Sequence, residues 1–358
     1  MKFGQNQEEI LRSIRNLSRY TVILGTILFG CILSLVYLIL KFPPRSEAII
    51  QSEKIHSPEK SILDPKSNFG KASELQIWKA PDSTEIPKGA MGEDIKYGHE
   101  LIVHTSRYFG PNGSIAHLTN GMNCQNCHLE GGTRTFGNNF ASFYSSYPKL
   151  SNRSGKMSPP SQRIVECMQR SLSGVSPDTN SKEIRAILSY LKWIGQGVKK
   201  SDKLFGTASE KLPFLTMAAD PEKGKVLYVG KCQTCHGKDG EGVWSKDRNE
   251  YIYPPLWGKF SFNDGAGMYR IINMAGFIKN NMPYGANYLN PQLSNEEAWN
   301  LAAFIESQPR NHFNQSQDWK DLRKKPIDLP YGPYLDGASE KQHKYGPFKP
   351  IQEELSKL

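Results

Sequence analysis

The sequence has no long run of lysine or arginine and no patch in which basic and aromatic residues alternate. Such features bind nucleic acids, so their absence argues against a nucleic-acid-binding protein, although the formal net charge is +10. The charge instead suits an anionic small substrate or an acidic protein partner. Hydrophobic residues make up only 38%, against 31 glycines and 23 prolines, which favours small, loop-rich domains over one large core.

Cysteine is also scarce, with six residues in the chain. Four of them stand in two matching frames, "CQNCH" at 124–128 and "CQTCH" at 232–236. A C-x-x-C-H frame is the attachment signature of c-type haem, since two thiols bond the porphyrin and the histidine binds its iron. A redox-active thiol pair or half a zinc site would leave the histidine unexplained. We therefore expect two covalently bound haem c groups, attached at Cys124, Cys127, His128, Cys232, Cys235 and His236.

Residues 21–40 carry no charge and would reach about 30 Å as a helix, the thickness of a bilayer core. We expect an uncleaved transmembrane helix, with a cleaved signal peptide or a lipoprotein signal ending at Cys31 as alternatives. Haem is attached to c-type cytochromes outside the cytoplasm. We therefore expect a single-pass protein of the cytoplasmic membrane, with residues 1–20 in the cytoplasm and the haem domains on the periplasmic side.

The rest of the chain predicts an all-α protein with two tandem cytochrome c-like domains. Amphipathic helices at 180–196 and 294–308 close the two domains, capped at Asn180 or Ser181 and at Ser294 or Asn295. The expected segments are a tether (41–84), a first haem domain (85–200), a linker (201–217), a second haem domain (218–310) and an extended C-terminal tail (311–358).

The second domain offers Met282 as the iron ligand opposite His236. Pro283 disfavours helix at Met282, so this side chain is expected in a loop just after a helix. Ligation by Met and His gives a relatively high potential, which suits electron exit. Lys279 lies one helical turn earlier and is a competing ligand.

The first domain lacks a Met-Pro pair, which draws attention to Cys167 in "RIVECMQRSLSG" at 163–174. On a helix, Arg163, Cys167, Arg170 and Ser171 share one face. Neighbouring guanidiniums favour a thiolate, and a thiolate is a strong iron ligand. An inert buried cysteine is the alternative. Arginines beside a redox centre suit a sulfur or phosphorus oxyanion, and Arg153 is placed to complete the clamp.

Several longer stretches resemble the dihaem thiosulfate dehydrogenases, which are tandem c-type cytochromes. They are "GMNCQNCHLEGGTR", "RIVECMQRSLSG", "PPLWGKFSFNDGAGM", "FIKNNMPYG" and "KPIDLPY", within about residues 85–335. The resemblance implies a catalytic first haem ligated by His128 and Cys167 and a second ligated by His236 and Met282. It also implies a substrate pocket of Arg153, Arg163 and Ser171, with Arg170 nearby. Asn281 departs from members that carry lysine there, and the membrane anchor departs from soluble relatives.

We therefore expect an oxidoreductase that couples two thiosulfate ions into tetrathionate, in a reaction that is reversible in principle. Its electrons would pass to a cytochrome c or another periplasmic acceptor. Two alternatives remain. One is a membrane-anchored dihaem electron carrier without a substrate, and the other is an enzyme for another sulfur or nitrogen oxyanion.

Overall fold

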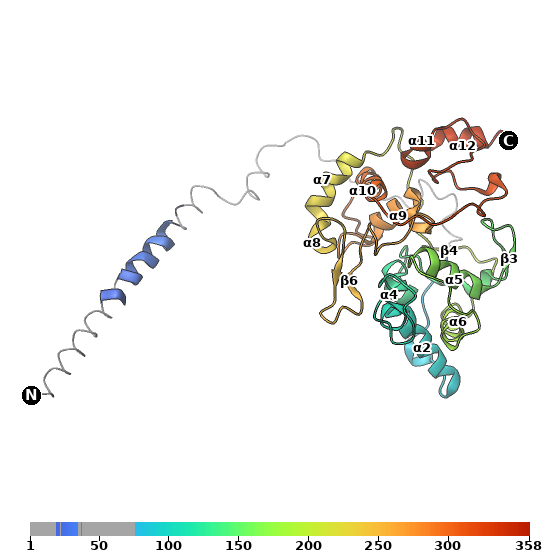
Figure 1. Ribbon diagram of the computed structural model, residues 1–358, viewed down its shortest axis with the longest axis horizontal. Helices are drawn as coiled ribbons and strands as arrows, with labels where there is room; N and C mark the ends of the chain where they lie inside the picture. Colours follow the sequence, from blue (N-terminus) through green and yellow to red (C-terminus); the bar gives the residue numbers. More distant parts are fainter. Residues whose placement is uncertain (1–18, 22, 35–36, 38–75) are drawn as a thin grey trace, which may run out of the picture. The chain divides into compact units, whose positions relative to one another are not determined.

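The computed structural model describes residues 19–21, 23–34, 37 and 76–358, and the chain divides into two units, 1–72 and 73–358 (Figure 1). The described residues of the first unit are helical and exposed. No helix in the described part of the chain is both long and apolar enough to cross a membrane. Residues 1–18 and 41–75 lie outside the described residues, as do 22, 35–36 and 38–40 of the expected span, which stays a prediction.

Helices make up most of the regular structure of the second unit (Figure 1). The α-helices are α2 (Ala90–Val103), α3 (Thr105–Phe109), α4 (Leu129–Gly132), α5 (Pro160–Arg170), α6 (Lys182–Ile194), α7 (Pro221–Lys231), α8 (Gln233–His236), α9 (Ile271–Asn281), α10 (Asn295–Ser307), α11 (Glu340–Tyr345) and α12 (Lys349–Leu355). The 3-10 turns are η2 (Ser83–Glu85), η3 (Cys124–Asn126), η4 (Tyr144–Ser146), η5 (Gly267–Tyr269) and η6 (Leu322–Lys324).

Short strands form three two-stranded pairs that the all-α prediction missed. The parallel pair is β1 (Gln76–Ile77) with β4 (Leu204–Phe205); the antiparallel pairs are β2 (Lys149–Leu150) with β3 (Met157–Ser158) and β5 (Val243–Trp244) with β6 (Tyr251–Tyr253). Strands of two or three residues are too short to show an alternating pattern in the sequence. The first pair joins the end of the expected tether to the expected linker.

The first hydrophobic core lies where α2 packs against α6. Leu101 and Ile102 of α2 and Ile184 and Leu191 of α6 are almost fully buried in it. Gly98 allows the close approach of the two helices, because a Cβ there would lie 2.0 Å from the carbonyl oxygen of Ala186.

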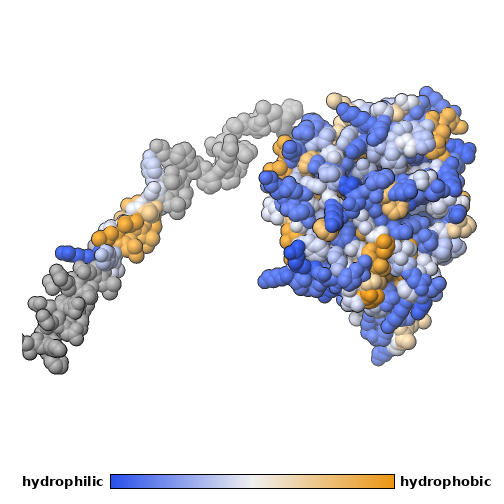
Figure 2. Space-filling view, viewed as in Figure 1, coloured by the Kyte–Doolittle hydropathy of each residue, from blue (hydrophilic) through white to orange (hydrophobic). Residues whose placement is uncertain are grey.

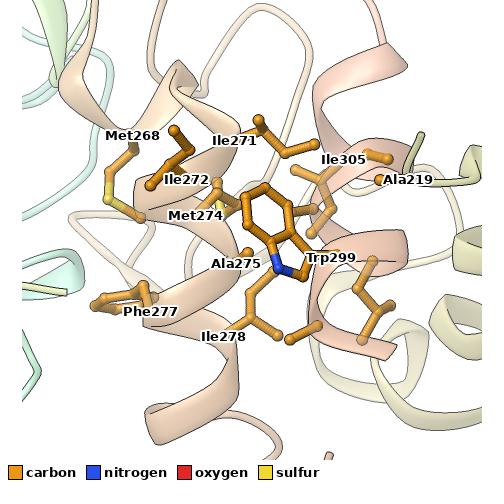
Figure 3. Packing of buried hydrophobic residues seen from close by; sticks show 14 of the residues in the cluster. Ala219, Met268, Ile271, Ile272, Met274, Ala275, Phe277, Ile278, Trp299 and Ile305 are labelled. Carbon is orange, nitrogen blue, oxygen red and sulfur yellow. The ribbon is translucent and has the colours of Figure 1, made fainter. Parts of the chain in front are cut away.

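The second core lies between α7, α9 and α10. Figure 3 shows the indole of Trp299 from α10 against Met274 and Ala275 of α9. At the crossing of α7 and α10, a Cβ on Gly224 would lie 1.9 Å from the carbonyl oxygen of Asn300. Each core therefore has a glycine where its terminal helix crosses an earlier one. Burial of apolar groups in these cores leaves the visible face of this unit largely hydrophilic (Figure 2).

Both expected closing helices are present, with serine caps. The Ser181 side chain accepts a hydrogen bond from the backbone N–H of Ile184 at the start of α6. Ser294 and Glu297 form a reciprocal capping box at the start of α10. Of the two expected candidates for each cap, the serine is the correct one.

The expectation of an extended tail over residues 311–358 is wrong for its last part, which forms α11 and α12. Ser339 caps α11 by accepting from the backbone N–H of Gln342. Phe348 and Ile351 are 2% and 1% exposed and belong to the second core. The two helices are too short to show a clear apolar period, and their stability comes from this packing.

The two cores interlock. Tyr251 of β6 belongs to the first core, although β6 follows the second C-x-x-C-H frame in the chain. Its ring stacks on Trp244 of β5, with centroids 3.8 Å apart. In the other direction, Cys127 and Leu129 pack against the second core. The first C-x-x-C-H frame therefore lies between the two halves of this unit.

Candidate functional site

A cavity of about 270 Å³ is lined by residues between Ile102 and Leu191. Its ionisable and nucleophilic lining includes Cys124, Cys127, His128, Tyr147, Lys149, Arg163, Cys167 and Ser171. Its apolar lining consists of Ile102, Phe109, Phe140, Phe143, Ile164, Met168, Leu172, Ile187 and Leu191. The C-x-x-C-H frame and the cysteine about 40 residues after it, found separately in the sequence, thus line one cavity, which we call the thiol cavity.

His128 is held in the orientation that a metal-binding imidazole needs. Its Nδ1 lies 2.5 Å from the carbonyl oxygen of Asn138, so Nδ1–H donates and the Nε2 lone pair stays available. The ring stacks on Phe140 at a centroid distance of 4.3 Å. Burial lowers the pKa of His128 to about 4, so the ring is neutral near neutral pH.

Neither thiol of the first frame forms a disulfide, and before haem attachment burial raises the pKa of Cys124 to about 11 and that of Cys127 to about 12. The side-chain hydroxyl of Thr105 accepts from the backbone N–H of Cys124 at 3.0 Å. Two free thiols, an imidazole with an available Nε2 and apolar walls fit a covalently attached haem. This donor set matches the group that the frame predicts.

The second frame orients its histidine in the same way, although its backbone forms the α-helix α8 and not a 3-10 turn. His236 ends α8, is 9% exposed, and its Nδ1 lies 2.8 Å from the carbonyl oxygen of Pro254. Met282 follows α9 directly in extended backbone, as predicted for a residue before proline. Met282 and Cys232 both pack against the second core. These positions are compatible with a second haem, and iron ligation by Met282 stays a prediction.

Lys279, the expected competitor of Met282, is half-buried on α9. Burial lowers its pKa, while the charges of Glu210 and Glu297 act in the opposite direction. The neighbouring Asn281 is 4% exposed, and its Nδ2 donates to the carbonyl oxygens of Phe136 and Phe277. A lysine could not make both contacts from a buried position without placing its charge there.

Three of the four residues predicted on one face of the 163–171 helix line the thiol cavity: Arg163, Cys167 and Ser171. The charge of a Cys167 thiolate raises the pKa of Arg163 above its ordinary value. Glu166 lies beside them, with its Oε2 3.5 Å from Nη1 of Arg163. The cavity therefore carries a cation beside Cys167, the thiol that lies outside the C-x-x-C-H frame.

The predicted helical face also included Arg170, but this residue does not line the thiol cavity. Nor does it line the adjoining cavity that contains Arg153. Its Nη1 lies 2.8 Å from Oδ2 of Asp318. Its guanidinium carbon Cζ lies over the ring of Phe313, 4.2 Å from the ring centroid. At the C-terminal end of α5, the helix turns this side chain away toward the tail. Arg153 shares the same carboxylate, with Nε 3.4 Å from Oδ2 of Asp318. Burial lowers the pKa of Arg153 to about 10, helped by Arg170 and Arg163.

Some residues near this site carried no signal in the sequence. Arg153 lines a second cavity with Tyr147, Lys149, Glu166 and Trp319. Trp319 belongs to a tail without regular pattern and reaches Arg153 only through the fold, where its backbone N–H donates to the Arg153 carbonyl oxygen at 2.7 Å. Glu166 could have been found as a carboxylate within the arginine-flanked helix.

The chain is similar in sequence to cytochrome c and to thiosulfate dehydrogenases. A family model described as cytochrome c matches residues 221–309. The thiosulfate dehydrogenase of Stutzerimonas stutzeri is 35% identical over 257 residues, which cover 72% of this chain and 80% of that protein. This chain belongs to the thiosulfate dehydrogenase family. The family member from Allochromatium vinosum is 36% identical over 241 residues, covering 66% of this chain and 85% of that protein.

A solved structure agrees with this placement in the thiosulfate dehydrogenase family. The "as isolated" form of the thiosulfate dehydrogenase TsdBA from Marichromatium purpuratum superposes with a TM-score of 0.60 at 28% identity. The match covers 74% of this chain and 52% of that one, so the present chain spans about half of that protein's length. Membership of the family makes the protein an oxidoreductase with covalently bound c-type haem.

Proposed function

We propose that the protein oxidises two thiosulfate ions to one tetrathionate ion at the first of two covalently bound haems. The observation that carries this proposal is the thiol cavity, whose lining includes the first C-x-x-C-H frame, Cys167 and Arg163. A haem site with a third thiol outside the C-x-x-C-H frame and a guanidinium suits a sulfur oxyanion better than simple electron transfer, which needs neither group.

In this proposal His128 and Cys167 would hold the iron of the first haem, and His236 and Met282 would hold that of the second. When bound, the haems would supply the redox chemistry, with a place for two electrons and a route from it to a cytochrome c or another periplasmic acceptor. The apolar lining of the thiol cavity excludes water around the reacting sulfur atoms and strengthens electrostatic interactions there. Arg163 and Ser171 bind the sulfonate oxygens of the first thiosulfate and orient its outer sulfur toward Cys167.

The sulfur chemistry then balances in two steps. The outer sulfur of one thiosulfate bonds to the thiolate Sγ of Cys167, and the two electrons lost in this oxidation would go to the haem groups and on to the electron acceptor. A second thiosulfate attacks the outer sulfur of the adduct, the bond to Cys167 breaks, and tetrathionate leaves with the Cys167 thiolate restored. No proton is taken up or released. The same steps in reverse reduce tetrathionate.

The proposal extends to location. We propose that residues 21–40 anchor the chain in the cytoplasmic membrane and that the haem domains lie on its periplasmic side. The uncharged stretch and the need to attach haem outside the cytoplasm support this arrangement.

Replacement of Cys167 tests the proposed activity. Cys167→Ala should lower the rate of thiosulfate oxidation with an artificial electron acceptor by about 100-fold or more, because the sulfur carrier is lost. Cys31→Ala is the matched control, since Cys31 is an exposed free cysteine of the other unit. Low-temperature electron paramagnetic resonance of the oxidised protein should show a thiolate-ligated haem that the Cys167→Ala variant lacks. Normal thiosulfate turnover by this variant would refute the mechanism, and wild-type protein that transfers electrons without thiosulfate turnover would be a simple carrier.

A further inference from the structure

The segment that follows the first C-x-x-C-H frame contacts the chain on both sides of Met282. Before Met282, Nδ2 of Asn281 donates to the carbonyl oxygen of Phe136 at 3.1 Å. After it, the carbonyl oxygen of the fully buried Ala286 accepts from Nη2 of Arg134 at 2.6 Å. Residues of the first half therefore hold the chain at both ends of the turn that carries the expected iron ligand of the second half.

Residues 283–290, which we call the 283–290 loop, have few polar links to the rest of the fold. Tyr284 is 94% exposed, and the other hydrogen bonds of the loop lie within it. Among the described residues outside the loop, Arg134 is the one that forms a hydrogen bond with it. The Tyr288 ring adds an edge contact with Phe136, at a centroid distance of 5.8 Å. The polar attachment of the loop therefore depends on one guanidinium.

The segment that carries Arg134 is itself fixed in place. The backbone N–H of Phe136 donates to the carbonyl oxygen of Gly206 at 2.7 Å, and the carbonyl oxygen of Asn138 accepts from Nδ1 of His128. At Phe136 φ is +57°, a left-handed conformation that is unfavourable for a bulky residue and persists only where the surrounding contacts determine it. The segment therefore offers a firm support from which Arg134 reaches the 283–290 loop.

We infer that Arg134 is a positioning residue for the second haem site. It holds the 283–290 loop in place and thereby keeps the thioether of Met282 available to the iron. This inference rests on the proposed iron ligation by Met282. A thioether is an uncharged, weak ligand, so its binding depends on how firmly its chain is held. The hydrogen bond from Arg134 has a charged donor and is therefore stronger than a bond between neutral groups.

Competition with imidazole measures how firmly Met282 is held. In the oxidised, haem-loaded full-length protein, imidazole displaces a methionine ligand and abolishes the weak near-infrared absorption band that methionine gives to ferric haem. Arg134→Gln should lower the apparent Kd of imidazole at the second haem by about tenfold, through loss of one charge-assisted hydrogen bond. Arg134→Lys keeps a cationic donor without the planar fork and should lower it by about threefold.

Two further variants separate this contact from general effects of charge. Glu130→Gln removes the carboxylate 3.2 Å from Nη1 of Arg134 but leaves the bond to Ala286, so the imidazole Kd should stay within about twofold of wild type. Arg185→Gln is the matched control, since the exposed Arg185 also donates to a backbone carbonyl oxygen, that of Asn180 in the first half.

The outcomes separate this role of Arg134 from the proposed function. An imidazole Kd within about twofold of wild type in Arg134→Gln would refute the role, as would an equal shift in Glu130→Gln or Arg185→Gln. If Arg134→Gln does not fold, the shift in Arg134→Lys decides. Wild-type protein without the methionine band would refute both the role and ligation by Met282, and would leave the turnover test of Cys167→Ala untouched. A shift confined to the Arg134 variants supports the role even if Cys167→Ala keeps its turnover.

Discussion

Asp318 is the single carboxylate between two guanidiniums, and its replacement by asparagine removes their shared counter-charge. The Asp318 and Arg170 side chains are 8% and 9% exposed, and the Arg153 side chain is 17% exposed. Removal of one partner from a buried ion pair destabilises a protein by about 3–5 kcal/mol. Since the amide can still accept one hydrogen bond, we expect Asp318→Asn to lower the free energy of unfolding by about 3 kcal/mol.

Urea unfolding followed by tryptophan fluorescence measures this effect, with Asp321→Asn as the control. Asp321 pairs with Arg323 on the surface, so its variant should change stability by no more than about 0.5 kcal/mol. A double-mutant cycle with Arg170→Met adds a second test. In the Asp318→Asn background, Arg170→Met should lower the free energy of unfolding much less than it does in wild type. The expected coupling energy is about 2 kcal/mol.

Sulfate gives an independent check on the same reasoning. Loss of Asp318 leaves the second cavity with more unneutralised positive charge, so sulfate should stabilise Asp318→Asn more than wild type. A loss of less than about 1 kcal/mol in Asp318→Asn, no coupling to Arg170, or equal stabilisation of both proteins by sulfate would refute the reasoning.

Other parts of the unit allow three further predictions. Burial raises the pKa of Glu306 from 4.5 to about 7, so its ionisation destabilises the fold. Between pH 4.5 and pH 7 the free energy of unfolding of wild type should therefore fall by about 3 kcal/mol relative to that of Glu306→Gln. Urea unfolding measures this difference, and parallel pH profiles of the two proteins would contradict it. At Gly121 φ is +94° and a Cβ would lie 2.4 Å from Trp244; Gly121→Ala should cost about 1–3 kcal/mol and change the indole fluorescence, and an unchanged spectrum would argue against the contact. Ser181→Ala should lower stability by about 1 kcal/mol in thermal unfolding through loss of the α6 cap, whereas Ser189→Ala within the same helix should change it little; equal effects would refute a capping role.

The features that could be predicted from the sequence depend on local spacing. The C-x-x-C-H frames, the helix that carries Cys167 and the loop position of Met282 each follow from residues within about ten positions of one another. The serine caps and apolar periods of α6 and α10 are local in the same way. The sequence therefore indicates the reactive groups and most of the helices.

What could not be predicted depends on contacts between distant segments. Arg170 shares a helical face with Cys167 by spacing, yet the carboxylate that neutralises it comes from position 318. Trp319 reaches the second cavity from the tail, and α11 and α12 form because Phe348 and Ile351 find a place in the second core. Helical periodicity gives the direction of a side chain but not the segment that meets it.

The hairpin of β5 and β6 has a consequence for how such chains can be cut or recombined. Tyr251 and Trp244 follow the second haem frame in the chain, yet they complete the packing of the first half. A chain break within residues 201–217 would separate the first core from Trp244 and Tyr251. These two aromatic side chains would then be exposed on the second fragment. Exchange of one half between relatives would therefore need a partner whose β5–β6 hairpin fits the first core.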